Sequence, residues 1–163
     1  MTLHAPALLD AHHTLNAFDS GITSFDAWLK RRARANQAGG ASRAYVVAQD
    51  ARVVAYYALA SGNIAAREAG GRLRRDMPDP VPVVTLARLA VDRSFQQRGL
   101  GRDLVQNAAR RVLAAAGIIG IRGIIVHAIS DQAKAFYLHC GFVPSPTSEM
   151  TLMISLADLR ACP

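Results

Sequence analysis

Hydrophobic residues recur at two different periods along the chain and predict a mixture of helices and strands. Phe25, Trp28 and Leu29 fall on one helical face and predict a helix over residues 25–37, with Ser24 as its N-cap. Further helices are expected over residues 98–116 and 130–139, and strands over residues 44–48, 53–60, 83–91, 124–129, 142–143 and 149–156.

The order of these elements favours an α+β fold. Two early strands stand at hairpin distance, whereas strands and helices alternate later in the chain. Residues 61–80 are rich in glycine, proline and arginine and predict a short helix and a basic loop. The length of 163 residues favours one domain over residues 1–163.

A glycine-rich turn follows the most continuous apolar strand. Residues 96–101 read Gln-Gln-Arg-Gly-Leu-Gly and stand between the strand at 83–91 and the long helix. The start of a helix carries unpaired N–H groups and the positive end of its dipole, and glycine lets an anion approach the backbone. The turn lacks the lysine and hydroxyl residue of a nucleoside-triphosphate loop and the full dinucleotide fingerprint. It therefore predicts a pyrophosphate site of another kind.

The last predicted helix carries a second distinctive segment. Residues 133–142 read Ala-Lys-Ala-Phe-Tyr-Leu-His-Cys-Gly-Phe, with Phe136 and Tyr137 one turn before the helix end. A tyrosine beside a phenylalanine is commonly an amphipathic core residue. A catalytic role requires its phenol to face the cofactor, which spacing alone does not establish.

The glycine turn and this segment, taken together and in this order, resemble the GNAT family of N-acetyltransferases. The resemblance implies a central mixed, mostly antiparallel sheet of about six to seven strands, splayed at the cofactor site and flanked by about four helices. It implies acetyl-CoA as co-substrate and no metal. The cofactor-binding residues that it implies are Leu89, Ala90, Val91, Gln96, Gln97, Arg98, Gly99, Leu100, Gly101, Arg102 and Phe136.

The same resemblance assigns roles to parts of this site. The N–H groups of residues 97–102 are expected to hold the pyrophosphate, and the end of the strand at Leu89 and Val91 to pair with the pantetheine amides. Tyr137 stands where many relatives have their general acid. Many relatives also have an asparagine at the start of the last helix. Here Ser130 and Asp131 stand there, and no cofactor contact is assigned to them.

A narrower resemblance, to the acetyltransferase toxins of toxin–antitoxin pairs, covers nearly the whole chain. It rests on short segments that include Phe18-Asp19-Ser20-Gly21, Asp26-Ala27-Trp28-Leu29, Tyr56-Tyr57-Ala58-Leu59, Met77-Pro78-Asp79-Pro80, Arg88-Leu89-Ala90-Val91 and His127-Ala128-Ile129-Ser130-Asp131. Those toxins acetylate the α-amine of aminoacyl-tRNA and so stop translation. The resemblance also implies a homodimer and neutralisation by a ribbon-helix-helix antitoxin.

The charge of the chain independently favours a polyanionic partner. The formal net charge is +7 and the pI is about 10.2. Arginines cluster in two basic stretches, and others flank the glycine turn, a distribution that suits a phosphate backbone. The residues expected to bind tRNA are Arg74, Arg75, Arg88 and Arg93. Such a surface argues against a small cationic substrate such as an aminoglycoside or a polyamine.

No residue stands out as a general base. An α-amine has a pKa near 7.7–8, so a useful fraction is neutral at pH 7 and can attack a thioester directly. The possible bases, by proximity in the sequence alone, are Glu68, Asp76, Asp79, Asp92, His127 and His139.

Two other functions stay open from the sequence. One is an acetyltransferase acting on protein N-termini, on lysines or on a small amine. The other is a non-catalytic acyl-CoA-binding module, against which Tyr137 and the intact glycine turn argue.

The remaining features favour a cytoplasmic setting. Cys140 and Cys162 form neither a metal-binding spacing nor a disulfide framework. The N-terminus lacks the features of a signal peptide, and no apolar run approaches the length of a bilayer span.

Overall fold

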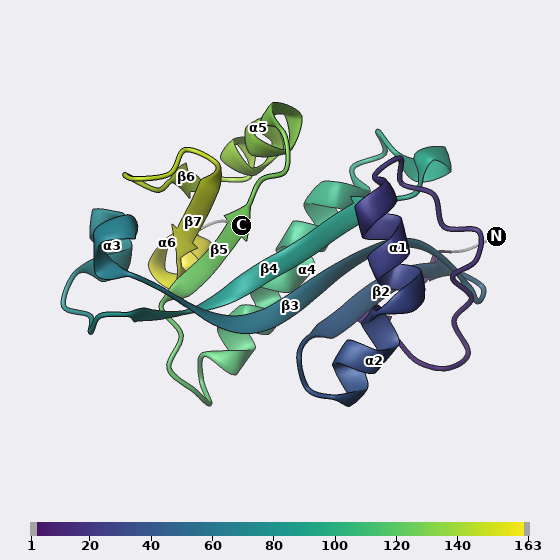
Figure 1. The fold of residues 1–163 in the computed structure, drawn as a ribbon, viewed down its shortest axis with the longest axis horizontal. Helices are drawn as coiled ribbons and strands as arrows, with labels where there is room; N and C mark the ends of the chain where they lie inside the picture. The colour runs from purple at the N-terminus through teal and green to yellow at the C-terminus, as the bar shows by residue number, and fades with distance from the viewer. Residues whose placement is uncertain (1–2, 162–163) are drawn as a thin grey trace. The chain divides into compact units, whose positions relative to one another are not determined.

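One mixed sheet of seven strands, in the order β1-β2-β3-β4-β5-β7-β6, organises the chain (Figure 1). The structure is a computed structural model that describes residues 3–161, so Cys162 lies outside the described residues. The strands are β1 (Ala7–Leu8), β2 (Arg43–Gln49), β3 (Arg52–Ile64), β4 (Val81–Val91), β5 (Gly123–His127), β6 (Val143–Pro144) and β7 (Thr151–Ser155). The expected fold class and number of strands are confirmed.

Six α-helices are present among the described residues, where about four were expected. They are α1 (Thr23–Arg31), α2 (Ala33–Ala38), α3 (Gly71–Arg74), α4 (Leu100–Ala115), α5 (Asp131–His139) and α6 (Leu156–Ala161), with 3-10 turns η1 (Ala66–Glu68) and η2 (Arg93–Phe95). The difference arises because the one helix expected over residues 25–37 is two helices, α1 and α2, and because α6 was not expected; α2 and α6 have six residues each. Helices this short give a weak periodic signal.

Antiparallel pairing dominates the sheet, as expected. β1 with β2, β2 with β3, β5 with β7, and β6 with β7 are antiparallel. β4 and β5 are parallel, with Val84 opposite Ile124 and Thr85 opposite Ile125, near the start of both strands.

The contacts divide the described residues into two compact units. The first unit comprises the residues up to Ala60 together with Ala87–Ala108, and the second comprises Ser61–Leu86 together with the residues from Ala109 onward. β4 therefore contributes its first part to the second unit and its last part to the first. A splay of β4 from β5 at the cofactor site, and the organisation of the chain as one domain, stay predictions.

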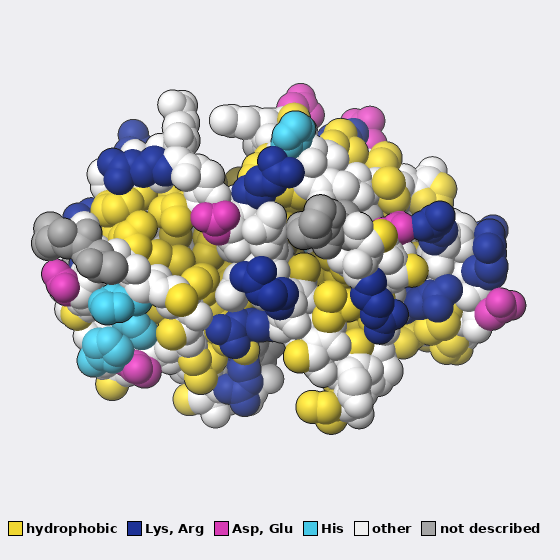
Figure 2. Space-filling view, turned by 180° about the vertical axis from the view of Figure 1, so that it is seen from behind, with side chains coloured by type: hydrophobic (Ala, Val, Ile, Leu, Met, Phe, Trp, Pro, Cys, Tyr) yellow, Lys and Arg dark blue, Asp and Glu magenta, His cyan; other side chains and the backbone are white. Residues whose placement is uncertain are grey.

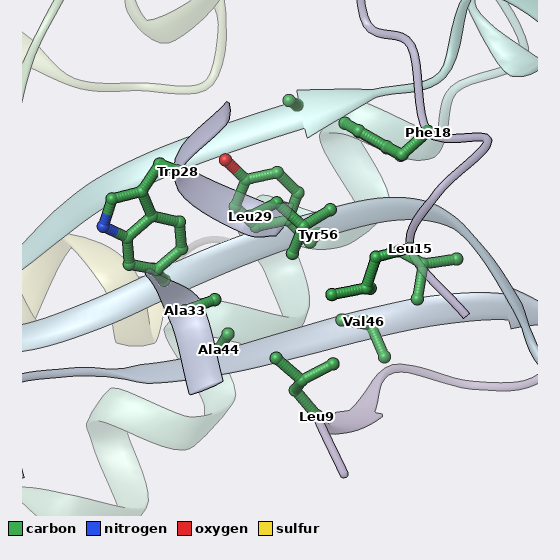
Figure 3. Packing of buried hydrophobic residues seen from close by; sticks show 12 residues of the cluster. Leu9, Leu15, Phe18, Trp28, Leu29, Ala33, Ala44, Val46 and Tyr56 are labelled. Atoms are coloured by element: carbon green, nitrogen blue, oxygen red, sulfur yellow. The ribbon is translucent and has the colours of Figure 1, made fainter. Parts of the chain in front are cut away.

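The core of the first unit forms around Tyr56. Its ring packs edge-on to Phe18, with centroids 5.6 Å apart, and stacks with Trp28 at 5.9 Å (Figure 3). Its hydroxyl donates a hydrogen bond of 2.8 Å to the Phe25 carbonyl, so the buried phenol is satisfied. This packing holds α1 against β3 and connects the N-terminal segment to the sheet.

The predicted helix over residues 25–37 is two helices, and Ser24 does not cap it. Asp26 accepts hydrogen bonds from the Ser20 N–H and hydroxyl, and the helix starts earlier, with Ile22 at the N-cap. After the break at Arg32, Gln37 bridges the N-terminal segment and β2 through the Leu9 carbonyl and the Ala44 N–H. These contacts orient α2 independently of α1.

The second unit has its own core, in which α3 packs near β5 and β7. Its buried residues are Ile64, Ala69, Leu73, Val81, Val83, Ile125 and Met153. Gly123, at the start of β5, lies so close to the Ile154 carbonyl and the Leu73 side chain that a Cβ would clash with both. This glycine therefore permits the close approach of α3 and β7 to β5.

Arg122 fastens α3 in place. Its guanidinium donates hydrogen bonds to the carbonyls of Leu73 at 3.1 Å, Arg72 at 3.0 Å and Arg75 at 3.2 Å. The last carbonyls of a helix have no partner within the helix, so a neighbouring arginine stabilises them. A helix of only four residues is held in this way by a residue far along the chain.

Candidate active site

The glycine turn lies between η2 and α4 and is open to solvent. Gln97 and Gly99 have positive φ angles of 62° and 82°, whereas Arg98 between them does not. Such alternation points successive N–H groups toward one side and forms a concavity suited to an anion. Residues 96–99 are exposed, so the concavity is accessible.

The first turn of α4 supplies further donors. The helix begins at Leu100, and its first intrahelical hydrogen bond near the turn runs from the Asp103 N–H to the Gly99 carbonyl at 3.1 Å. The N–H groups of residues 100–102 therefore precede the regular helical pattern and carry the positive end of the dipole. The Tyr57 hydroxyl donates to Asn107 at 2.5 Å and fixes α4 against β3.

Asp92 connects the segment that precedes the glycine turn to the N-terminal part of the chain. Its carboxylate, 3% exposed, accepts hydrogen bonds from the Asp19 N–H and from the Ser94 N–H and hydroxyl, and Arg52 lies 3.5 Å away. Burial alone would raise the pKa of the Asp92 carboxyl, but the hydrogen bonds and Arg52 together lower it. Asp92 is thus an ionised structural acceptor, which makes it a poor general base.

Gln96 connects the turn to two neighbouring segments. Its side-chain amide donates to the Val91 carbonyl at 2.9 Å and to the Ser20 carbonyl at 3.0 Å. This positioning role could not be predicted from the sequence, because both partners are backbone carbonyls of other segments. The side-chain amide nitrogen of Gln96 is already hydrogen-bonded, so a contact with the cofactor would have to use its other atoms. That contact stays a prediction.

The structure brings together the predicted cofactor residues at the end of β4 and those of the glycine turn. Leu89, Ala90 and Val91 form the end of β4, which leads through Asp92 and η2 into the turn. Leu89 and Val91 are partly exposed, whereas Ala90 is buried in the core. These residues and residues 96–102 all belong to the first unit.

Tyr137 lies in the second unit, on α5. Ser130 caps that helix by accepting the Ala133 N–H at 3.1 Å. The Tyr137 side chain is only 6% exposed and packs edge-on to Phe136 and Phe142, with centroids 5.1 Å and 5.5 Å away. Burial, aided by Cys140, raises the pKa of the Tyr137 phenol well above its ordinary value. The phenol holds its proton at neutral pH, and burial makes it a weaker acid than an exposed tyrosine.

The four arginines expected to bind tRNA differ in their environment. Arg93 contacts Asp19 at 3.2 Å, and Arg88 lies over the Trp28 ring with its guanidinium carbon 4.5 Å from the centroid. Arg74 and Arg75, in the second unit, are exposed, and their guanidiniums have no hydrogen-bond partner among the described residues. Arg88 therefore has a packing role that the sequence did not indicate.

None of the remaining candidate residues has surroundings that distinguish it as a general base. Asp79 accepts the Ala66 N–H at 3.0 Å, and His127 contacts the Thr151 hydroxyl at 3.1 Å. Glu68 is partly exposed, while Asp76 and His139 are exposed. The lack of a distinguished base among these candidates is compatible with direct attack by an amine that is already neutral.

Asp10, His12 and His13 form a group with metal-ligand chemistry on the first unit. Their ligand atoms lie within 4.8 Å of one another. However, the His13 Nδ1 accepts the Asp10 N–H at 3.1 Å, and the Asp10 carboxylate contacts His12. Burial lowers the pKa of His13, so its imidazole is neutral. Hydrogen bonds within the group account for its geometry.

With this geometry in view, the chain can be compared with known proteins. Residues 40–144 match the family described as the acetyltransferase (GNAT) domain. This range includes the glycine turn, the end of β4 and Tyr137. The chain belongs to the GNAT acetyltransferase family.

One similar protein is a tRNA-acetylating toxin of Mycobacterium tuberculosis (strain ATCC 25618 / H37Rv). The two are 50% identical over 157 residues, which is 96% of this chain and 95% of the relative. The similarity therefore extends well beyond the acetyltransferase domain to the N-terminal helices.

Solved structures of two toxins have the same fold. A tyrosine-to-phenylalanine mutant of KacT superimposes with a TM-score of 0.91 at 26% identity, covering 99% of both chains. AtaT complexed with acetyl-methionyl-tRNAfMet gives 0.90 at 28% identity, covering 98% of both chains. A structure of AtaTR bound with acetyl-CoA gives 0.81 at 29% identity, covering 98% of this chain and 96% of that one.

The described helices do not include a membrane span. None of them is long and apolar enough to cross a bilayer.

Proposed function

We propose that this chain is a toxin that transfers the acetyl group of acetyl-CoA to the α-amine of aminoacyl-tRNA and thereby blocks translation. The observation that carries this proposal is the 50% identity, over nearly the full length of both chains, to a tRNA-acetylating toxin. The acetylated amine can no longer form a peptide bond, so the aminoacyl-tRNA is lost to the ribosome.

The exposed turn after η2 is the proposed pyrophosphate cradle. The N–H groups of residues 97–102 donate to the phosphates, and the positive φ angles of Gln97 and Gly99 support this role because they create the concavity. The partly exposed end of β4 at Leu89 and Val91 pairs with the pantetheine amides, and Phe136 completes the cofactor contacts. Asp92 and Gln96 hold this framework in place before the ligand arrives.

Transfer proceeds by direct attack of the amine nitrogen on the thioester carbonyl carbon. An α-amine has a pKa near 7.7–8, which the ester bond to tRNA lowers further, so a useful fraction is neutral at pH 7 and the fraction increases toward pH 8. The carbon–sulfur bond breaks, water accepts the proton released by the amine, and Tyr137 donates a proton to the leaving thiolate. The position of Tyr137 within the matched GNAT domain supports this role, and its phenol holds a proton at neutral pH, as a tyrosine with its ordinary pKa also does.

Exposed arginines are the proposed tRNA contacts. Arg74, Arg75 and Arg93 present their guanidiniums to solvent, where phosphates can reach them. Two of the four already have a partner that a phosphate contact would compete with: Arg88 is half-buried over Trp28, and Arg93 pairs with Asp19.

The proposed function also implies partners and a location. AtaT has been solved bound to the C-terminus of the antitoxin AtaR, and KacTA has been solved with DNA. By analogy, we propose that this chain is a homodimer, acts in the cytoplasm and is neutralised by an antitoxin of the ribbon-helix-helix type.

Cell-free translation provides a direct test of the proposed toxicity. Purified protein is added to an extract programmed with one message, with and without added acetyl-CoA after removal of the endogenous pool. We expect synthesis to stop only when both the protein and acetyl-CoA are present. Synthesis should resume when fresh aminoacyl-tRNA is supplied after the protein has been removed.

Two results would contradict the proposal. Arrest without acetyl-CoA would indicate a mechanism other than acetylation. No arrest, combined with acetyl groups on lysines or N-termini of extract proteins, would instead assign the chain to protein acetylation.

A further inference from the structure

A groove on the second unit is surrounded by four arginines. Its volume is about 590 Å³, and Arg72, Arg75, Arg122 and Arg160 border it. Its other lining residues, mostly small or apolar, are Ala116, Ile121, Ser155, Leu156 and Ala157. Figure 2 shows dark-blue side chains gathered at the right of this face, over α3 and α6.

The positive charge of the groove is mostly uncompensated by the described residues. Arg72 pairs with Asp158. Arg122 donates to three backbone carbonyls, which leave its full charge in place. The exposed guanidiniums of Arg75 and Arg160 have no hydrogen bond or ion pair within the described part of the chain.

Such an arrangement favours an anion. Arginine keeps its proton at any physiological pH, so the four like charges cannot relieve their repulsion by deprotonation. Asp158 compensates only Arg72, and a bound anion would compensate the charges that solvent and mobile ions otherwise screen. The three carbonyl bonds engage Nε and Nη2 of Arg122 and fix the guanidinium in one orientation, so Nη1 is the nitrogen that remains for a ligand.

The residue type favours phosphate. A guanidinium binds a phosphate through two parallel hydrogen bonds, whereas lysine provides a point charge, and the chain has 17 arginines and only two lysines. Arginines on several sides of one groove suit a ligand with more than one phosphate. A volume of several hundred cubic ångströms accommodates a ligand larger than a single ion.

We propose that this groove binds the sugar–phosphate backbone of RNA. Under the proposed function, on which this identification rests, the RNA is the body of the tRNA substrate. The assignment adds Arg72, Arg122 and Arg160 to the arginines expected from the sequence, and it includes Arg75.

The test is equilibrium binding of a fluorescently labelled, uncharged tRNA as a function of salt concentration. We expect the double variant Arg75→Gln/Arg160→Gln to bind roughly tenfold more weakly near 100 mM salt, and the slope of log affinity against log salt to fall by about one to two. Arg110→Gln, which removes an exposed arginine of α4 outside the groove, should leave both quantities unchanged.

Arg122 is not a suitable variant because its loss would release α3. Instead, Arg160→Lys keeps the charge and removes the two-pronged geometry, so we expect an intermediate affinity with most of the salt slope retained. Thermal unfolding of each variant verifies that the fold is intact.

Two outcomes would overturn the inference. One is an affinity and a salt slope equal to those of the wild type in the folded double variant. The other is unchanged tRNA binding with loss of binding to an acidic antitoxin peptide, which would make the groove a peptide site. Because the probe carries no amino acid, either result is independent of whether the chain acetylates aminoacyl-tRNA.

Discussion

At the scale of single residues, Tyr137 is central to the proposed reaction. Its hydroxyl is the atom assigned to protonate the leaving thiolate, while its ring packs between Phe136 and Phe142. These two roles can be separated, because phenylalanine retains the ring and removes only the hydroxyl.

We expect Tyr137→Phe to lower turnover by about 10²–10⁴-fold, the usual contribution of general acid catalysis, with little change in acetyl-CoA affinity. Single-turnover kinetics and calorimetric titration with acetyl-CoA measure the two effects. Tyr56→Phe is the matched control: it loses the hydrogen bond to the Phe25 carbonyl and about 1 kcal/mol of stability but should keep turnover within about twofold. Wild-type turnover in Tyr137→Phe would remove the assigned role.

The pH dependence of the reaction should report the substrate amine and not the tyrosine. We expect kcat/KM to rise up to about pH 8, as the α-amine loses its proton, and then to stay level through pH 9. The raised pKa of Tyr137 places its deprotonation above this range, so activity is not lost there. A descending limb between pH 7 and 9 that is absent from Tyr137→Phe would contradict this assignment.

At the scale of elements, the turn between η2 and α4 is built by backbone conformation and by contacts from distant residues. Gly99 adopts a positive φ angle with open space around it, so an added Cβ would meet no neighbour. A side chain added at residue 99 would therefore act only through the strain that it imposes on the backbone.

We expect Gly99→Ala to destabilise the protein by about 1–2 kcal/mol, the cost of the left-handed conformation. Relaxation of the turn should also weaken acetyl-CoA binding roughly fivefold or more, because a change of 1 kcal/mol corresponds to about that factor. Gly120→Ala, which also meets no neighbour but has no positive φ, should change neither. Unaltered cofactor affinity in Gly99→Ala would argue against the cradle.

Asp92 should stabilise the first unit in a pH-dependent way. We expect Asp92→Asn to cost about 2 kcal/mol at pH 7, or roughly 4–8 °C in Tm, because its buried carboxylate accepts several hydrogen bonds. Since folding lowers the pKa of Asp92, this stabilisation is present above the ordinary aspartate pKa and disappears as the pH falls through the lowered one.

Thermal unfolding of both proteins from pH 7 down to pH 3 measures this effect. The Tm difference should narrow at the acidic end, whereas the exposed turn residue variant Asp50→Asn should match the wild type throughout. A constant difference between Asp92→Asn and the wild type would show that the carboxylate charge is not the cause.

The sequence predicted elements well where their signal is local. The predicted helix over residues 98–116 is α4, Leu100–Ala115, and the predicted strand over residues 83–91 lies within β4. The sequence predicts a strand over residues 149–156 and no helix after it, whereas the structure has the shorter strand β7 followed by α6. Its signal is nevertheless present, because the Ser155 hydroxyl accepts the Asp158 N–H in the spacing of an N-cap.

Other features could not be predicted because they depend on residues far apart in the chain. The division of α1 from α2 accompanies hydrogen bonds from Gln37 to Leu9 and Ala44, and α3 depends on Arg122. Likewise, the glycine turn was located from its motif, but its support by Asp92 and Gln96 depends on residues 19 and 20. Hydrophobic periodicity contains no information on such contacts.

At the scale of the whole molecule, a net charge of +7 and membership of the GNAT family agree with a polyanionic cofactor and a polyanionic substrate. The charge alone does not distinguish an RNA from an acidic protein. The distinction requires identification of the molecule that receives the acetyl group.

The most direct measurement is therefore the transfer of labelled acetyl from acetyl-CoA to a mixture of aminoacyl-tRNAs, with uncharged tRNA and bulk protein as parallel acceptors. We expect label on aminoacyl-tRNA alone, located on the α-amine by mass spectrometry after nuclease digestion, and we expect this label to be lost in Tyr137→Phe. Label on protein or on free amines, with none on aminoacyl-tRNA, would contradict the proposed substrate while leaving the acetyltransferase fold in place.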